Sequence, residues 1–148
     1  MDKKKEVLEL TSRGAEELTS IARQIIEFAG EETIWRIEGE MGAGKTTLVI
    51  ALCQALGILD HATSPTFSLV NEYQDEQGTP YYHFDFYRIK EEEEAAAIGT
   101  EEYFDSGAIC FLEWASLIPN LLPEQYLLIQ IDILDPMTRR FKVTKHHE

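Results

Sequence analysis

One segment of the chain has the residue types and the spacing of a phosphate-binding loop. It runs from Gly39 to Thr46, reads GEMGAGKT and matches the pattern G-x-x-x-x-G-K-[ST]. Glycines let successive backbone N–H groups turn toward an anion, and a helix beginning near Lys45 adds the positive end of its dipole. Lys45, taken as an exposed point charge, could bridge the β- and γ-phosphates, and the Thr46 hydroxyl could ligate Mg²⁺. The pattern therefore predicts a nucleotide site that uses magnesium.

The sequence favours ATP over GTP as the nucleotide. GTPases of the Ras type normally carry the pattern N-K-x-D for guanine, and neither Asn71 nor Asn120 lies in one. A small-molecule kinase of the P-loop class is the alternative function, and such an enzyme would close an arginine-rich lid over its substrate. The chain has only six arginines and no such lid, which weakens the kinase hypothesis but leaves it open. A nucleotide-gated interaction module with negligible turnover is a third hypothesis.

A short turn motif lies between the helix that follows this loop and the next expected strand. It reads Ser64-Pro65-Thr66-Phe67 and occupies the place where P-loop switch enzymes keep their first switch. Pro65 fixes the turn, and Thr66 could contact the γ-phosphate or the metal. An ordinary turn at the start of a strand is equally compatible with the pattern.

The segment HFDFYR alternates between polar and aromatic residues. In a strand, His83, Asp85 and Tyr87 share one face, while Phe84 and Phe86 share the other. We interpret the phenylalanines as core residues. The polar trio is either a solvated sheet face or an ordered cluster beside the phosphates.

An acid and a tryptophan follow the apolar run 108–112, which is typical of a strand buried on both faces. Ligands of open α/β sheets bind at the carboxyl ends of the strands. Glu113 is therefore placed to hold Mg²⁺, directly or through water, although acids at such positions often have no function. Trp114 could stack on adenine, contact a partner or cover the core.

Composition bounds the fold and the partners. With 148 residues, 44% of them hydrophobic, the chain is long enough for one domain with a full core. Its net charge of −14 has the wrong sign for neutralising phosphates, so we expect no strong binding of nucleic acid by this protein alone. No apolar stretch approaches the roughly 20 residues of a membrane span, and no secretory signal is recognisable. We expect a cytoplasmic protein that does not bind membranes, with Cys53 and Cys110 as buried thiols.

The order of the expected elements indicates an α/β fold. Helices are expected over 12–30 with Ser12 as N-cap, and over 46–56, 91–98 and 101–104. Strands are expected over 33–38, 67–74, 81–88, 108–112, 126–134 and 140–145, with the second and third and the last two forming hairpins. We therefore predict a single P-loop NTPase-type domain over residues 1–148, whose mixed sheet of parallel and antiparallel strands is flanked by helices.

Four motifs, taken together and in this order, resemble the TsaE family, the bacterial ATPases of tRNA threonylcarbamoyladenosine biosynthesis. The motifs are GEMGAGKTT, SPTF, HFDFYR and LEW, and the resemblance covers nearly the whole chain. It implies an ATP- and Mg²⁺-dependent hydrolase of low intrinsic activity that does not itself transfer the threonylcarbamoyl group. It also implies two partners, the transferase subunit and its paralogue, and a role in modifying adenosine 37 of tRNAs that read A-starting codons.

The resemblance further implies roles for single residues. It places Mg²⁺ on Thr46 and Glu113. It makes Lys45 catalytic, Thr66 the switch residue, and Asp85 a catalytic or supporting carboxylate near the γ-phosphate. The residues implied to bind the nucleotide are Met41, Gly42, Ala43, Gly44, Lys45, Thr46, Thr47, Trp114, Arg139 and Thr11.

Three of these assignments come with a neighbouring alternative or a departure from the family pattern. Arg139 is the best match for an arginine of the last hairpin that reaches the nucleotide, and the adjacent Arg140 is the alternative. Thr11 belongs to the segment 10–12, where the family contact to adenine is expected. Glu16 and Glu17 stand close by, where family members often carry threonine. Met41 replaces the common leucine, which is a volume-conserving change.

Overall fold

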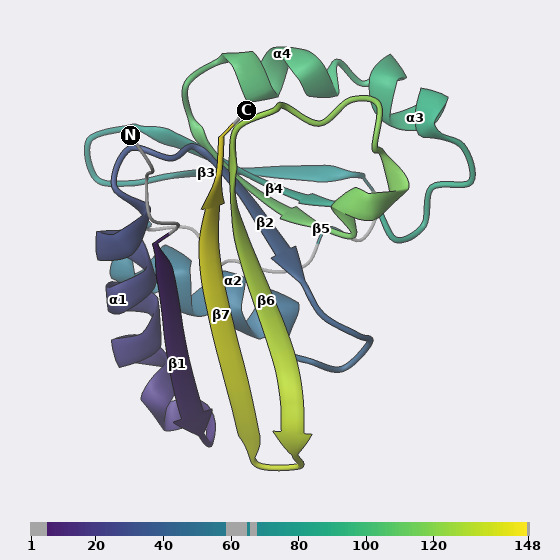
Figure 1. Cartoon of the computed structure of the whole chain (residues 1–148). Coiled ribbons are helices and arrows are strands. Elements are labelled where there is room, and N and C mark those ends of the chain that lie inside the picture. Colours follow the sequence, from purple (N-terminus) through teal and green to yellow (C-terminus); the bar gives the residue numbers. More distant parts are fainter. Residues whose placement is uncertain (1–5, 59–64, 66–67, 148) are drawn as a thin grey trace, which may run out of the picture.

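A computed structural model of the protein describes residues 6–58, 65 and 68–147. These residues form one seven-stranded sheet with helices on both faces (Figure 1). The mixed α/β fold expected from the order of elements is thereby confirmed. None of the helices in these ranges is both long and apolar enough to span a membrane.

The elements follow one another largely as the sequence predicts. The strands are β1 (Val7–Arg13), β2 (Ile34–Glu38), β3 (Val70–Gln74), β4 (Pro80–Asp85), β5 (Ile109–Glu113), β6 (Tyr126–Asp135) and β7 (Thr138–His146). The helices are α1 (Leu18–Ala29), α2 (Lys45–Ala55), α3 (Glu92–Ala97) and α4 (Thr100–Asp105), with short 3-10 turns at Ala15–Glu17 and Ala115–Leu117. Both expected hairpins form, as β3–β4 and β6–β7.

The strand order in the sheet is β1-β7-β6-β2-β5-β4-β3. The central strand β2 pairs in parallel with both β5 and β6, and β4 pairs in parallel with β5. The outer pairs β1–β7, β6–β7 and β3–β4 are antiparallel. The carboxyl ends of β2, β4 and β5 therefore lie at the same edge of the sheet, which is where ligands bind in such folds.

Two hydrophobic cores lie on opposite faces of the sheet. On one face, α1 and α2 pack against side chains that include Trp35, Ile37 and Phe111. On the other face, α3, α4 and the segment before β6 cover Phe84 and Leu112. Strand β5 contributes to both cores, as its apolar run predicts. Both cores hold a free cysteine, Cys53 in the first and Cys110 in the second, which confirms the expected buried thiols.

The prediction for the N-terminal segment was wrong. Ser12 does not cap the first helix but lies inside β1, opposite Arg139 of β7. Helix α1 begins only at Leu18, after the positive-φ residue Gly14 and a 3-10 turn. The reason is that Leu8 and Leu10 alternate with exposed residues and pack against the first core, which is a strand pattern.

The expected strand over 81–88 ends earlier, at Asp85. Tyr87 therefore does not continue the face formed by His83 and Asp85, and its side chain is half exposed.

The break between the two short helices is confirmed at Gly99, which adopts a left-handed conformation with φ of 80°. Glu91 and Glu94 form a capping box at the start of α3, so this part of the acidic run stabilises a helix end.

Candidate functional site

The glycine loop, residues 39–46, connects the end of β2 to the start of α2. Gly39 is packed so closely that an added Cβ would lie 2.9 Å from the carbonyl oxygen of Ile131 and 3.0 Å from the Cβ of Ala43. Gly44 has φ of 102°, a left-handed value that L side chains rarely adopt, and forms the N-cap of α2. The loop thus has the backbone that the sequence motif requires, in the strand–loop–helix context that the motif needs.

Lys45 lies folded back over this loop. Its Nζ donates hydrogen bonds to the carbonyl oxygens of Gly39 (2.6 Å) and Glu40 (3.2 Å) and lies 4.3 Å from the centre of the Trp114 ring. Its side chain is only 6% exposed, so the assumption of an exposed point charge was wrong. Burial lowers the pKa of Lys45, and nearby carboxylates, first among them that of Glu113, partly offset this effect.

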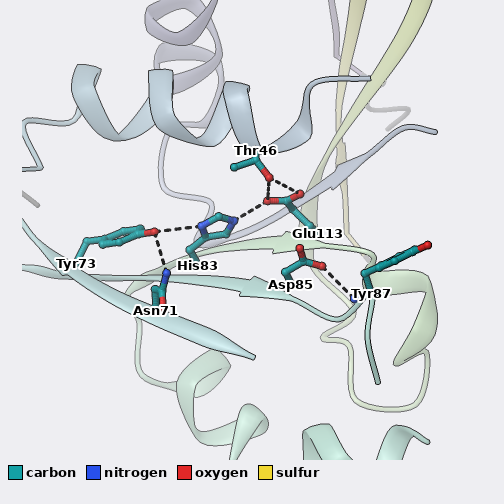
Figure 2. A network of polar contacts seen from close by, with 7 residues as sticks. All are labelled: Thr46, Asn71, Tyr73, His83, Asp85, Tyr87 and Glu113. Carbon is teal, nitrogen blue, oxygen red and sulfur yellow. Dashed lines mark hydrogen bonds and ion pairs between the residues drawn. The ribbon is translucent and has the colours of Figure 1, made fainter. Parts of the chain in front are cut away.

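The metal ligands implied by the family resemblance meet at the start of α2. The Thr46 hydroxyl lies 2.9 Å and 3.0 Å from the two carboxylate oxygens of Glu113 and donates to them (Figure 2). Glu113 is the last residue of β5 and is 3% exposed. The parallel pairing of β2 with β5 carries this acid to the edge of the sheet from which the glycine loop departs.

Asp85 and His83 lie beside Glu113 on the neighbouring strand. Asp85 is the register partner of Glu113 in the β4–β5 pair, so both carboxylates project from the same face of the sheet. The Oδ1 atom of Asp85 accepts a hydrogen bond of 3.0 Å from the backbone N–H of Tyr87. His83 is fully buried, and its Nε2 lies 2.6 Å from Glu113 Oε2. His83 therefore lies in an ordered polar cluster with Glu113 rather than on a solvated sheet face, while the position of this cluster beside phosphates stays a prediction.

A cleft of about 980 Å³ opens in front of these groups. It is lined by most of the expected site residues, namely Met41, Gly42, Gly44, Lys45, Thr46, Thr47, Asp85, Glu113 and Trp114. Its far side is formed by Leu69, Arg88 and Glu94, among others. The cleft thus joins the start of α2, the carboxyl ends of β4 and β5, and the start of α3.

Trp114 closes one side of this cleft in a strained conformation. Among the described residues it is the one non-glycine with a left-handed backbone, at φ of 60°. Its ring packs against Tyr87, with 5.0 Å between the ring centres, while Lys45 lies against it as described. The tryptophan is therefore part of the cleft wall and is fixed by two neighbours.

A smaller groove of about 290 Å³ lies on the other side of the glycine loop. Three parts of the chain form its walls. They are the glycine loop with the start of α2 (Gly42, Ala43, Gly44 and Thr47), the segment from β1 to the start of α1 (Ser12, Gly14, Ala15 and Leu18), and the last hairpin (Pro136, Met137, Arg139 and Phe141). The Nε of Arg139 donates to the carbonyl oxygen of Ala43 at 3.1 Å. The groove is therefore continuous with the loop that borders the larger cleft.

The structure separates the two candidate arginines. Arg139 touches the glycine loop, whereas Arg140 alternates to the opposite face of β7 and pairs with Asp132 at 3.1 Å in an exposed position. Thr11 is the register partner of Arg140 and is exposed, so its side chain lies on the face away from the groove. Its neighbour Ser12 is buried and lines the groove instead. Thr66, the expected switch residue, lies outside the described residues.

The sequence of the chain matches a model of a known protein family. The family model described as "Threonylcarbamoyl adenosine biosynthesis protein TsaE" matches residues 12–141. The chain belongs to the TsaE family. Its resemblance to that family, first seen in four short motifs, is thereby confirmed over most of its length.

Individual relatives agree with the family model. A Bacillus subtilis protein named tRNA threonylcarbamoyladenosine biosynthesis protein TsaE is 40% identical over 116 residues, which are 78% of this chain and 72% of that protein. A Haemophilus influenzae protein of the same name is 40% identical over 99 residues, 67% of this chain and 62% of the relative, and so less than two thirds of its length. The crystal structure of YdiB from Bacillus subtilis is 32% identical, covers 97% of this chain and 88% of its own, and superposes with a TM-score of 0.74.

Several site residues were not found from the sequence. Ser12 was interpreted as a helix cap, and the residues 136–137 of the hairpin turn carried no signal of a groove. The alternation of Leu8 and Leu10 could have revealed β1, and with it the face on which Ser12 lies. No sequence signal places Arg88 in the cleft, because that placement depends on where β4 ends.

Proposed function

We propose that this protein binds and hydrolyses ATP with Mg²⁺, as a P-loop ATPase, and acts in tRNA threonylcarbamoyladenosine biosynthesis. The observation that carries the nucleotide part is the contact of the Thr46 hydroxyl with the Glu113 carboxylate at the N-terminus of α2. It places a hydroxyl and an acid together beside a glycine loop, which is the arrangement that magnesium and nucleotide phosphates require. The biosynthetic part rests on membership of the TsaE family and on the names of the relatives.

The residues present fit a magnesium ion bound together with phosphates. Mg²⁺ is usually held by one or two carboxylates, a hydroxyl and substrate phosphates rather than by an all-protein cage. Thr46 and Glu113 would hold it here, because their oxygen atoms already lie within 3.0 Å of one another and line the cleft. When bound, the ion supplies positive charge that offsets the charge of the phosphates.

The glycine loop and Lys45 would hold the phosphates. The backbone N–H groups at the start of α2 are free of intrahelical partners by the nature of a helix end, and they face an anion-binding position. The Lys45 ammonium has three donors, of which two contact its own loop. Exchange of these carbonyl contacts for phosphate oxygens would strengthen the bonds, since both partners are then charged.

Asp85 is the residue proposed to orient the attacking water. Its carboxylate lines the cleft next to Glu113, and its backbone contact with Tyr87 fixes its orientation. A carboxylate in that place can accept a hydrogen bond from water facing the terminal phosphate. Thr66 stays a proposed switch residue on the strength of the motif alone.

The smaller groove is the proposed place for the nucleoside. It continues from the glycine loop, and Ser12, Arg139 and Met137 offer a hydroxyl, a cation and an apolar surface around it. A nucleotide whose phosphates lie on the loop would reach this groove with its base. We therefore propose Arg139 rather than Arg140 as the nucleotide-contacting arginine, and Ser12 in place of Thr11 for the side-chain contact.

The proposed partners are the transferase subunit and its paralogue, with the tRNA held by those proteins. The net charge of −14 supports this division, because binding of a nucleic acid depends on clustered lysines and arginines that release counterions. ATP binding would control the docking of this protein onto the complex, since segments ordered by the γ-phosphate are a common means of such control.

A combined binding and turnover experiment tests the proposal. The purified protein is titrated with ATP and ADP with and without MgCl₂, and phosphate release is then measured with and without the two partner proteins. We expect Mg²⁺-dependent nucleotide binding and slow hydrolysis that rises when the partners are added. Hydrolysis that the partners leave unchanged, together with phosphate transfer to a metabolite, would support the kinase alternative instead.

A further inference from the structure

A buried histidine links the proposed magnesium site to the edge strand β3. His83 is fully buried, and its two ring nitrogens contact different groups. Nε2 lies 2.6 Å from Glu113 Oε2, and Nδ1 lies 3.3 Å from the hydroxyl oxygen of Tyr73 (Figure 2). Asn71 continues the chain, with its amide nitrogen 3.4 Å from the same hydroxyl. Nothing in the proposed hydrolysis so far uses this imidazole.

The direction of the hydrogen bonds around His83 follows from the chemistry of one group in the network. An ionised carboxylate only accepts hydrogen bonds, so Glu113 Oε2 accepts from His83 and the imidazole carries a proton at Nε2. A neutral imidazole protonated at Nε2 accepts at Nδ1, where the Tyr73 hydroxyl lies at donor distance. The hydrogen bonds from Tyr73 to His83 and from His83 to Glu113 therefore both run toward the carboxylate.

This order has a consequence for the two oxygen atoms of Glu113. Oε2 accepts from His83 and shares the single Thr46 proton with Oε1. Oε1 therefore keeps the larger remaining capacity to bind a cation. Rotation of the carboxylate about its terminal bond would break the 2.6 Å contact with the imidazole, so His83 fixes the plane of the group that faces the cleft.

We propose that His83 is a positioning residue whose Nε2–H, oriented by Tyr73, holds Glu113 in the geometry that binds Mg²⁺. The inference rests on the magnesium site of the proposed function. Groups that orient a metal ligand in this manner reduce the reorganisation needed on binding, and their removal typically lowers metal affinity about 10–100-fold. The alternative is that His83 only fills space between β4 and α2.

Two substitutions of His83 separate these roles. His83→Gln carries an amide N–H near the position of Nε2, whereas the shorter His83→Asn reaches only the position of Nδ1. Phe84→Leu is the matched control, because Phe84 is equally buried on the same strand but faces the opposite core. Each variant is first checked by thermal unfolding, and a fluorescent ADP analogue is then titrated in EDTA and at increasing MgCl₂.

We expect the affinity for the ADP analogue in EDTA to stay within about twofold in all variants. The MgCl₂ concentration that gives half of the magnesium effect should rise about 10–100-fold in His83→Asn but only a few-fold in His83→Gln. Phe84→Leu should lower the melting temperature and leave the magnesium response unchanged. If His83 only filled space, its replacement would not change the magnesium affinity selectively, so this pattern would support a role in positioning Glu113.

Other results would overturn the inference. They are an unchanged magnesium response in His83→Asn, an equal loss in His83→Gln, or an equal loss in Phe84→Leu, which would attribute the effect to distortion of β4. A wild-type protein whose nucleotide affinity does not respond to Mg²⁺ would overturn the proposed metal site and this inference with it. A wild-type response that His83→Asn retains would overturn the inference alone.

Discussion

Replacement of Lys45 with alanine should affect the protein in two measurable ways, one on the fold and one on the nucleotide. Lys45 donates two hydrogen bonds to its own loop and lies against Trp114. Hydrogen bonds from a charged donor contribute about 1.5–3 kcal/mol each, and a cation–π contact about 0.5–1 kcal/mol. Alanine recovers about 2 kcal/mol of lysine rotamer entropy and the cost of burying an ammonium group. We expect a net loss of about 1–2 kcal/mol in the free energy of unfolding, which lowers the melting temperature of a 148-residue chain by about 3–6 °C.

The effect on the nucleotide should be larger. ATP at 100 times its Kd adds about 2.7 kcal/mol to the stability of the wild-type protein, or about 10 °C. Loss of the charged contacts to the phosphates should raise the Kd about 100-fold, for a cost of about 2.7 kcal/mol. At the same ATP concentration the variant would then gain only about 0.4 kcal/mol, a rise of about 1–2 °C.

Thermal unfolding with and without ATP and MgCl₂ measures both quantities in one series. Lys145→Ala is the matched control, because Lys145 also lies over an aromatic ring, that of Phe28 at 5.0 Å, but lines neither the cleft nor the groove. This control should keep the full rise with ATP. A Lys45→Ala variant that still rises by about 10 °C would refute the assignment of Lys45 to the phosphates.

Three further outcomes are expected. Glu113→Gln keeps the shape but removes the charge, so Mg²⁺-dependent hydrolysis should fall at least about 10-fold while ADP affinity in EDTA stays within about threefold; if both fall together, Glu113 is structural. Gly39→Ala should lower the melting temperature more than Gly57→Ala. An added Cβ at Gly39 would meet the Ile131 carbonyl oxygen at 2.9 Å, whereas Gly57 has a positive φ but no atom within 4 Å of an added Cβ. Equal changes in melting temperature would contradict the close packing at Gly39. In a fluorescence titration at physiological salt the isolated protein should not bind tRNA below about 10 µM, and micromolar binding that survives deletion of residues 1–5 would show that the charge argument fails.

The sequence predicted those parts of the fold that local patterns determine. The glycine loop, the apolar strand β5 and the two hairpins have strong local signals, in glycine spacing, in continuous apolar residues and in turn composition. Strand β1 was missed because its alternation is short and Ser12 also suits a helix cap. The choice between a strand and a helix cap at Ser12 depends on pairing with β7, which is distant in the sequence and gives no local signal.

The candidate site was predicted in its residue types but not in its contacts. The motifs named Thr46 and Glu113 without showing that they touch. The burial of His83 could not be derived, because alternation gives which residues share a face and not what covers that face. The position of Lys45 was also predicted wrongly. The curvature of the loop brings the carbonyl oxygens of Gly39 and Glu40 to the Lys45 ammonium group, and the residue pattern does not give that curvature.

Because β1 pairs with β7, the smaller groove can form only after nearly the whole sheet has been synthesised. Ser12 leaves the ribosome early and Arg139 late, yet the two are register partners and line the same groove. Until β7 is made, Leu8 and Leu10 have no strand beside them, and this wall of the groove does not exist. Closure of such distant partners is slow compared with local folding. The groove proposed for the nucleoside is therefore one of the last parts of the site to form, because it requires the pairing of β1 with β7.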